Sequence, residues 1–182
     1  MKSPFSATIA LLTINLLLAS CKTAHFQCTD PLGCLEIPPD SAVVIGVILA
    51  TSGQNGPVGL ESLQLVEEKV EAKDMLLGHR IKLFHYGTDC TADSARTAAT
   101  EFATYTDLSA VIGPTCTGES VVAGPILKDA GIPLLGPVAN SETALVLVNQ
   151  VFIAIEQVAV KMPDKTLFIP RQALFDALQP SP

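Results

Sequence analysis

Cysteine and histidine are the residues of this 182-residue chain with the widest chemical range. Cys116 lies in a Gly-Pro-Thr-Cys-Thr-Gly stretch before a helical pattern, where a thiolate would be an activated nucleophile, and His85 lies in a nearby strand pattern. The stretch lacks the small-x-nucleophile-x-small form and a third partner, so we expect no enzyme. His79, beside a glycine, is expected in a surface turn. No Cys-x-x-Cys or His-x-x-x-His spacing occurs, so we expect no metal and no cofactor.

The N-terminal 21 residues have the features of an export signal. Lys2 supplies one positive charge, an apolar run extends from Phe5 to Leu18, and small residues precede Cys21. The run is shorter than the about 20 apolar residues of a membrane-spanning helix. The Leu-Ala-Ser-Cys ending resembles the lipobox of bacterial lipoproteins. We therefore expect a signal peptide over 1–20, lipidation at Cys21 and an extracytoplasmic chain anchored in the membrane. An ordinary cleaved signal and a retained anchor are the alternatives.

The remaining cysteines are even in number, as expected for disulfides in an oxidising compartment. Cys28 and Cys34 lie six residues apart in a turn-rich region, a spacing that suits a local bridge. Cys90 and Cys116 remain. Four cysteines allow three pairings, and free buried thiols or a metal site are the alternatives.

The composition excludes one class of partner. The chain has 11 basic and 18 acidic residues, for a net charge of −7. Nucleic acid requires a basic surface, so we expect no nucleic-acid binding.

Apolar runs alternate with helical patterns from residue 42 onward. The run from Ala42 to Ala50 is continuous and rich in β-branched residues, as expected for a strand buried on both faces. Further strands are expected over 80–86, 110–112 and 132–135, with helices between and after them. This order builds βαβ units, so we predict an α/β three-layer sandwich with a parallel sheet. Residues 21–41 are rich in proline and polar residues and are expected to form a tether.

Ligands of such sheets bind at the carboxyl ends of the strands. The loops expected there cover 51–57, 87–91, 113–118 and 136–141, and all are rich in small or polar residues. Small residues let backbone N–H groups approach an anion, and helix N-termini add positive potential.

Several stretches in these regions resemble one family in order and spacing. They are Val44-Ile-Gly-Val with Ser52-Gly, Tyr86-Gly-Thr-Asp-Cys, Ala110-Val-Ile-Gly-Pro-Thr-Cys-Thr-Gly and Ala130-Gly-Ile-Pro-Leu-Leu-Gly-Pro. The chain resembles the solute-binding proteins of branched-chain amino acid ABC transporters, which have the type I periplasmic binding fold. The resemblance implies capture of an amino acid or amide and its delivery to ABC permease subunits. A ligand-sensing or surface interaction module is the alternative.

The resemblance also implies site residues. The family bridges a cysteine after the second strand to one after the third, which corresponds to Cys90 and Cys116. It binds the ligand carboxylate with the loop after the third strand, and further contacts come from the first and fourth loops. The residues that match these places are Thr117, Gly118, Ala139, Ser141 and Gln54.

The chain departs from the family pattern after residue 145. A second lobe should close over the ligand, and resemblance resumes only in two late segments, Phe152 to Val160 and Thr166 to Leu178. We therefore expect an internal deletion that joins a partial N-terminal lobe, 42–145, to a segment over 146–182 that resembles the end of the second lobe. Such a deletion would expose an edge of the sheet, and we expect a helix over 143–161 to fold back over the apolar surface.

Overall fold

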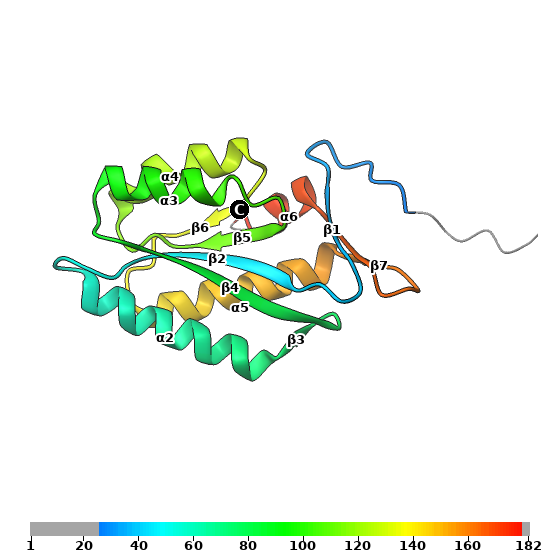
Figure 1. The fold of residues 1–182 in the computed structure, drawn as a ribbon, viewed down its shortest axis with the longest axis horizontal. Coiled ribbons are helices and arrows are strands. Elements are labelled where there is room, and N and C mark those ends of the chain that lie inside the picture. The colour runs from blue at the N-terminus through cyan, green and yellow to red at the C-terminus, as the bar shows by residue number, and fades with distance from the viewer. Residues whose placement is uncertain (1–25, 180–182) are drawn as a thin grey trace, which may run out of the picture.

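The structure, a computed structural model, describes residues 26–179 and has three layers (Figure 1). The middle layer is a five-stranded sheet with the order β3-β4-β2-β5-β6. Strands β4, β2, β5 and β6 are parallel, and only β3 is antiparallel, to β4. The bounds of these strands are β2 (Val43–Ala50), β3 (Met75–Leu76), β4 (His79–Thr88), β5 (Leu108–Ile112) and β6 (Leu134–Leu135).

Helices cover both faces of this sheet. Helices α3 (Ala92–Phe102) and α4 (Thr117–Asp129) lie on one face, and α2 (Gly56–Lys73) and α5 (Ser141–Val158) lie on the other (Figure 1). The α/β sandwich predicted from the alternating pattern is therefore confirmed. Among residues 26–179, no helix combines the length and apolar character needed to cross a membrane.

Strand β2 connects the two cores of the molecule. All eight of its residues are buried, because β4 and β5 pair with its two edges and helices cover its two faces. Side chains alternate between faces along a strand, so Val43 and Ile45 face the core under α2 and α5 while Val44 and Ile48 face the core under α3 and α4. This arrangement explains why the sequence here is a continuous apolar run.

Helix α5 folds back on the sheet, as expected for the apolar segment over 143–161. It packs beside α2 and begins at Asn140, whose side chain accepts a hydrogen bond from the backbone N–H of Thr143 at 2.8 Å. Its inner face buries a stripe of apolar side chains, which are Ala144, Val148, Val151, Phe152, Ala154 and Ile155.

The structure differs from the expected tether over 21–41 in the second half of that segment. Strand β1 (Cys34–Ile37) pairs with β8 (Leu167–Pro170), which pairs with β7 (Val160–Lys161), and together they form a second, antiparallel sheet. The Asp30 carboxylate accepts hydrogen bonds from two backbone N–H groups at the start of α6 (Arg171–Ala177). The contacts of β1 and Asp30 span 130 residues or more, so the local proline-rich composition does not reveal them.

His79 is buried and does not lie in a surface turn. Its Nδ1 lies 2.9 Å from the carbonyl oxygen of Ser41, and its Nε2 lies 2.9 Å from that of Lys165. Both partners are backbone carbonyl oxygens, which accept hydrogen bonds. The side chain thereby joins β4 to the turn between β7 and β8.

Arg171 fastens α6 to the main sheet. Its guanidinium donates to the backbone carbonyls of Thr106 at 2.9 Å, Gly131 at 3.0 Å and Leu108 at 3.4 Å, and burial lowers the pKa of Arg171. We expect Arg171→Met to lower the free energy of unfolding by about 2 kcal/mol, because the three backbone carbonyls that accept from its guanidinium lose their donor. Urea unfolding measures this, with Arg96→Met, an exposed residue of α3, as the control. An equal loss in both variants would contradict the proposed role of Arg171.

Candidate functional site

A disulfide joins two of the loops at the carboxyl edge of the sheet. Cys90, after β4, is bonded to Cys116, after β5, with a Cα–Cα distance of 5.6 Å. Both disulfides expected from the sequence are present, since Cys28 is also bonded to Cys34. Asn55, in the loop after β2, lies with its side-chain Nδ2 3.4 Å from the Cys90 sulfur and 3.3 Å from the Cys116 sulfur. Three loops therefore meet at this bridge.

A backbone hydrogen bond holds the loop after β6 close to the other three loops. The N–H of Val138 donates to the carbonyl of Pro114 at 2.8 Å, which holds the loops after β5 and β6 side by side. The hydroxyl of Thr115, which is buried, accepts a hydrogen bond from the N–H of Ala50 at 2.9 Å. The four loops expected to surround a ligand are thus adjacent.

The first turn of α4 presents unused donors at this edge. Thr117 and Gly118 are exposed, and no side-chain hydrogen bond within residues 26–179 uses the Thr117 hydroxyl. The first N–H groups of a helix have no partner inside the helix, so those of Thr117 and Gly118 remain available to an anion. Glu119 is fully buried and stabilises the turn, because its Oε2 accepts the N–H of Cys116 at 3.2 Å.

The other predicted site residues lie around this turn in different ways. Gln54 is exposed next to Asn55, and Ala139 is exposed in the loop after β6. Ser141 begins α5, and its hydroxyl donates to a carboxylate oxygen of Glu61 on α2 at 3.0 Å. The Ser141 side chain is therefore already engaged in joining two helices.

Asn55 and Glu61 were not predicted as site residues. Asn55 precedes a Gly-Pro helix start, and nothing in its spacing indicates that its amide reaches both sulfurs of a disulfide. Glu61 follows the helical spacing of an ordinary exposed residue of α2. Only the packing of α2 beside α5 brings it to Ser141.

Asp89, between β4 and α3, accepts hydrogen bonds that stabilise the turn in which it lies. The Asp89 carboxylate accepts hydrogen bonds from the N–H and the hydroxyl of Thr91, at 3.1 and 2.7 Å. Hydrogen bonds from Ser94 and Thr91 lower the pKa of Asp89 below its ordinary value. Asp89 consequently stays ionised and shapes the turn that carries Cys90.

The Cys90–Cys116 disulfide bears on two alternatives given above, a metal site and an enzyme with a cysteine nucleophile. The sulfurs of Cys90 and Cys116 and a carboxylate oxygen of Glu119 lie within 4.8 Å of one another. In the disulfide neither sulfur is a thiolate, and the thiolate is both the metal ligand and the nucleophile of cysteine chemistry. The bridge thus removes the nucleophile that the enzyme alternative requires.

Cys21, where the sequence predicts lipidation, lies outside the described residues. The candidate ligand edge, in contrast, lies wholly within them.

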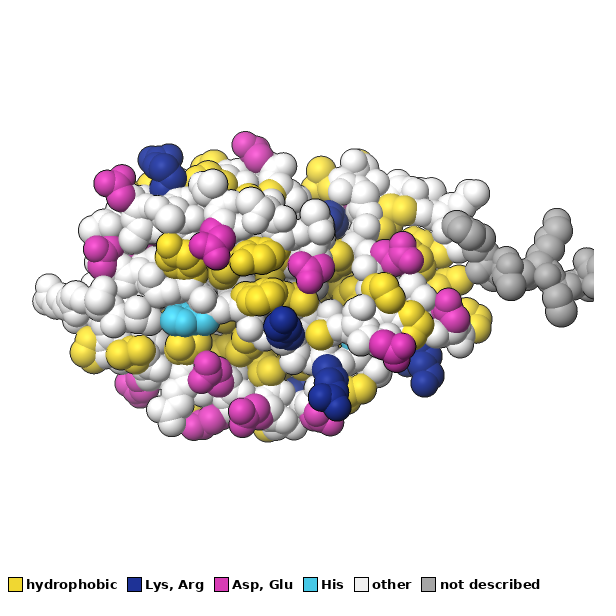
Figure 2. Space-filling model, in the orientation of Figure 1, with side chains coloured by type: hydrophobic (Ala, Val, Ile, Leu, Met, Phe, Trp, Pro, Cys, Tyr) yellow, Lys and Arg dark blue, Asp and Glu magenta, His cyan; other side chains and the backbone are white. Residues whose placement is uncertain are grey.

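On the face shown in Figure 2, acidic side chains are spread over both helical layers, and apolar side chains form a band between the layers.

Comparison with known families identifies the class of protein. Residues 59–158 match the model of the family described as "Receptor family ligand binding region". The chain belongs to this family. No curated protein matches the chain.

Solved structures with a similar fold are transport proteins. A Rhodospirillum rubrum protein assigned to a branched-chain amino acid ABC transporter is 24% identical, with a TM-score of 0.50, over 56% of this chain and 31% of its own. A leucine-binding protein of Thermotoga maritima is 25% identical, with a TM-score of 0.48, over 51% of this chain and 27% of its own. A Streptococcus pneumoniae branched-chain amino acid transporter substrate-binding protein, in complex with isoleucine, is 25% identical, with a TM-score of 0.47, over 52% and 28%.

The fold is that of a type I periplasmic binding protein lobe, present in part. The chain spans less than a third of the length of these three relatives.

Proposed function

We propose that this chain is an extracytoplasmic solute-binding lipoprotein of an ABC importer for amino acids of the branched-chain type, anchored through Cys21. It captures its ligand at the carboxyl edge of the main sheet and delivers it to permease subunits. The first turn of α4 carries this proposal, because the Thr117 hydroxyl and the N–H groups of Thr117 and Gly118 are exposed and form a donor set for a carboxylate.

The proposed site is open on one side. All four loops belong to a single sheet edge, and the described residues supply no second body that closes over it. Each hydrogen bond contributes only about 1 kcal/mol of net free energy, so a site with few of them and no second wall binds weakly. This is the behaviour expected of a binding protein impaired by an internal deletion, with a partial lobe over 42–145 and a late segment over 146–182.

The contribution of Thr117 can be tested with leucine as the probe. We expect Thr117→Val to weaken leucine binding about fivefold, because one hydrogen bond contributes about 1 kcal/mol. Thr100→Val, an exposed residue of α3, is the matched control and should leave the affinity unchanged. Equal affinities of the two variants, measured by NMR titration, would remove Thr117 from the site.

A further inference from the structure

Within residues 26–179, the last strand of the main sheet has one edge with which no other strand pairs. Strand β6 pairs with β5 on one side only, and it ends the sheet order. The N–H groups of Val111 and Gly113 donate to the carbonyls of Pro133 and Leu135. Backbone groups alternate in direction along a strand, so the N–H and C=O of Leu134 point away from β5, toward the open side.

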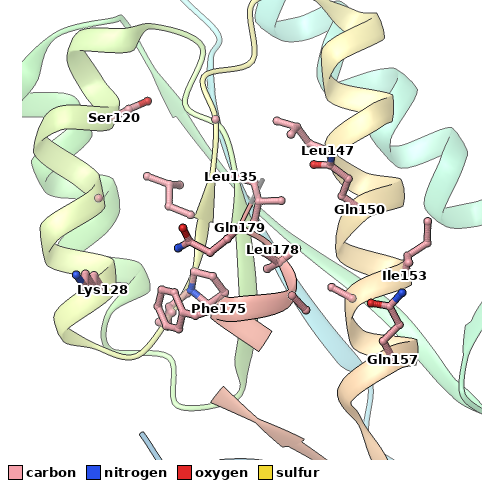
Figure 3. A pocket seen from close by; sticks show the side chains of 17 residues that line it. Ser120, Lys128, Leu135, Leu147, Gln150, Ile153, Gln157, Phe175, Leu178 and Gln179 are labelled. Atoms are coloured by element: carbon pink, nitrogen blue, oxygen red, sulfur yellow. The ribbon is translucent and has the colours of Figure 1, made fainter. Parts of the chain in front are cut away.

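This edge forms the floor of a groove of about 870 Å³. Figure 3 shows α4 on one side of it and α5 on the other, with the side chains of Phe175, Leu178 and Gln179 between the two helices. The wall from α4 consists of Ser120, Gly124 and Lys128. The wall from α5 is more apolar and includes Leu147, Ile153 and Ala154, and Phe175 and Leu178 of the C-terminal segment also line the groove.

The opposite edge of the sheet, formed by β3 and β4, is protected against pairing with a further strand, and the β6 edge is not. Strand β3 pairs only with His79 and Arg80, which leaves the rest of the outer edge of β4 free. The free part of that edge carries the exposed Lys82, and a charged side chain on an edge opposes strand pairing. Leu134 and Leu135 carry no such charge. The β6 edge therefore keeps the properties of a pairing surface.

The charges of the groove are unlike those of the whole chain. Among residues 26–179, no acidic residue lines it, although the chain has 18 acidic and 11 basic residues, and Lys128 is the one charged lining residue of that part of the chain. Ile153 is a large apolar side chain that is 53% exposed there. The groove thus favours an occupant with apolar and acidic groups.

We propose that this groove binds an extended peptide segment in which apolar residues alternate with small or acidic ones. The peptide adds to the sheet through hydrogen bonds with the backbone of Leu134. Its alternate side chains face opposite walls, as in any strand. Apolar side chains meet Leu147 and Ile153, and those on the other side are small near Gly124 and acidic near Lys128.

A labelled peptide, Gly-Val-Gly-Val-Glu-Val-Glu, tests this proposal by fluorescence anisotropy with the full chain. We expect saturable binding that weakens at least about tenfold when the glutamates become lysines. N-methylation of the central valine keeps every side chain and removes one backbone donor, and it should weaken binding by a similar factor. Equal binding of the N-methylated peptide, equal or tighter binding of the lysine peptide, or no binding would overturn the proposal.

Variants of the protein locate the peptide. Gly124→Leu places a side chain in the groove, and Val121→Leu, 72% exposed on the same helix and outside the groove, is its control. Ile153→Glu changes the other wall at an exposed position, so it keeps the test valid if Gly124→Leu does not fold.

The expected result is loss of binding in Gly124→Leu and Ile153→Glu with no change in Val121→Leu or Thr117→Val. Unchanged binding in both groove variants would refute the site. Sedimentation that shows a dimer broken by Ile153→Glu would assign the groove to a second copy instead. Because Thr117 lies at a different edge, failure here leaves the proposed solute site untouched.

Discussion

Replacing Gly113 with alanine is expected to lower the free energy of unfolding by more than about 4 kcal/mol, a loss reached only by a few mechanisms such as backbone overlap. Gly113 follows β5 and has a φ of +116°, which side-chain-bearing residues rarely adopt. A Cβ here would overlap the backbone carbonyl oxygen of Ile48 in β2. The strand ends would have to separate, and the loop that carries Cys116 would move with them.

Gly118→Ala is the matched control for this prediction. Gly118 lies in the first turn of α4, and a Cβ there meets no atom within 4 Å. Alanine should therefore keep or raise the stability by up to about 1 kcal/mol. Urea unfolding of both variants measures the difference. A loss in Gly113→Ala no larger than that in Gly118→Ala would show that the two strand ends do not approach as described.

Removal of the Cys90–Cys116 disulfide, by changing both residues to alanine, has the second largest expected effect. The bridge closes 26 residues, and the chain-entropy model gives about 3.5 kcal/mol of stability for a loop of this length. The variant should also loosen the first turn of α4, because Asn55 contacts both sulfurs and loses these partners.

Removal of the Cys28–Cys34 disulfide is the comparison for this loss of stability. Cys28–Cys34 closes six residues, for which the same model gives about 2.2 kcal/mol. Thermal unfolding of the two double-alanine variants, together with amide exchange at Thr117 and Gly118, separates the effects. A greater loss of stability from removing Cys28–Cys34, with unchanged exchange at α4, would contradict the role given to the longer bridge.

The parts of the fold that could be predicted from sequence are those with local signals. The continuous apolar run of β2 is visible because the strand is buried on both faces. Strand β1 has four residues before two prolines, and its partner β8 lies 133 residues further along the chain, so no local pattern indicates it. His79 likewise resembles a turn residue until Ser41 and Lys165 are brought to it by the second sheet.

The candidate site also has one part that the sequence predicts and one part that it does not. The order of strands and helices predicts that the four loops share one edge, because parallel strands end on the same side. Which side chains turn toward one another depends on packing, so Asn55 at the disulfide and Glu61 at Ser141 were missed. The groove beside β6 depends on two helices that both border the last strand, and that placement has no sequence signal.

The most direct test of the proposed solute site is an NMR titration of the isotope-labelled full chain with leucine. We expect a dissociation constant of about 1 mM or weaker, equivalent to a binding free energy no more favourable than about −4 kcal/mol, because the site is open on one side. Shifts should concentrate at Thr117 and Gly118 and extend to the loop of Ala139. Shifts elsewhere, no shifts at tens of millimolar leucine, or a dissociation constant near about 1 μM would contradict it.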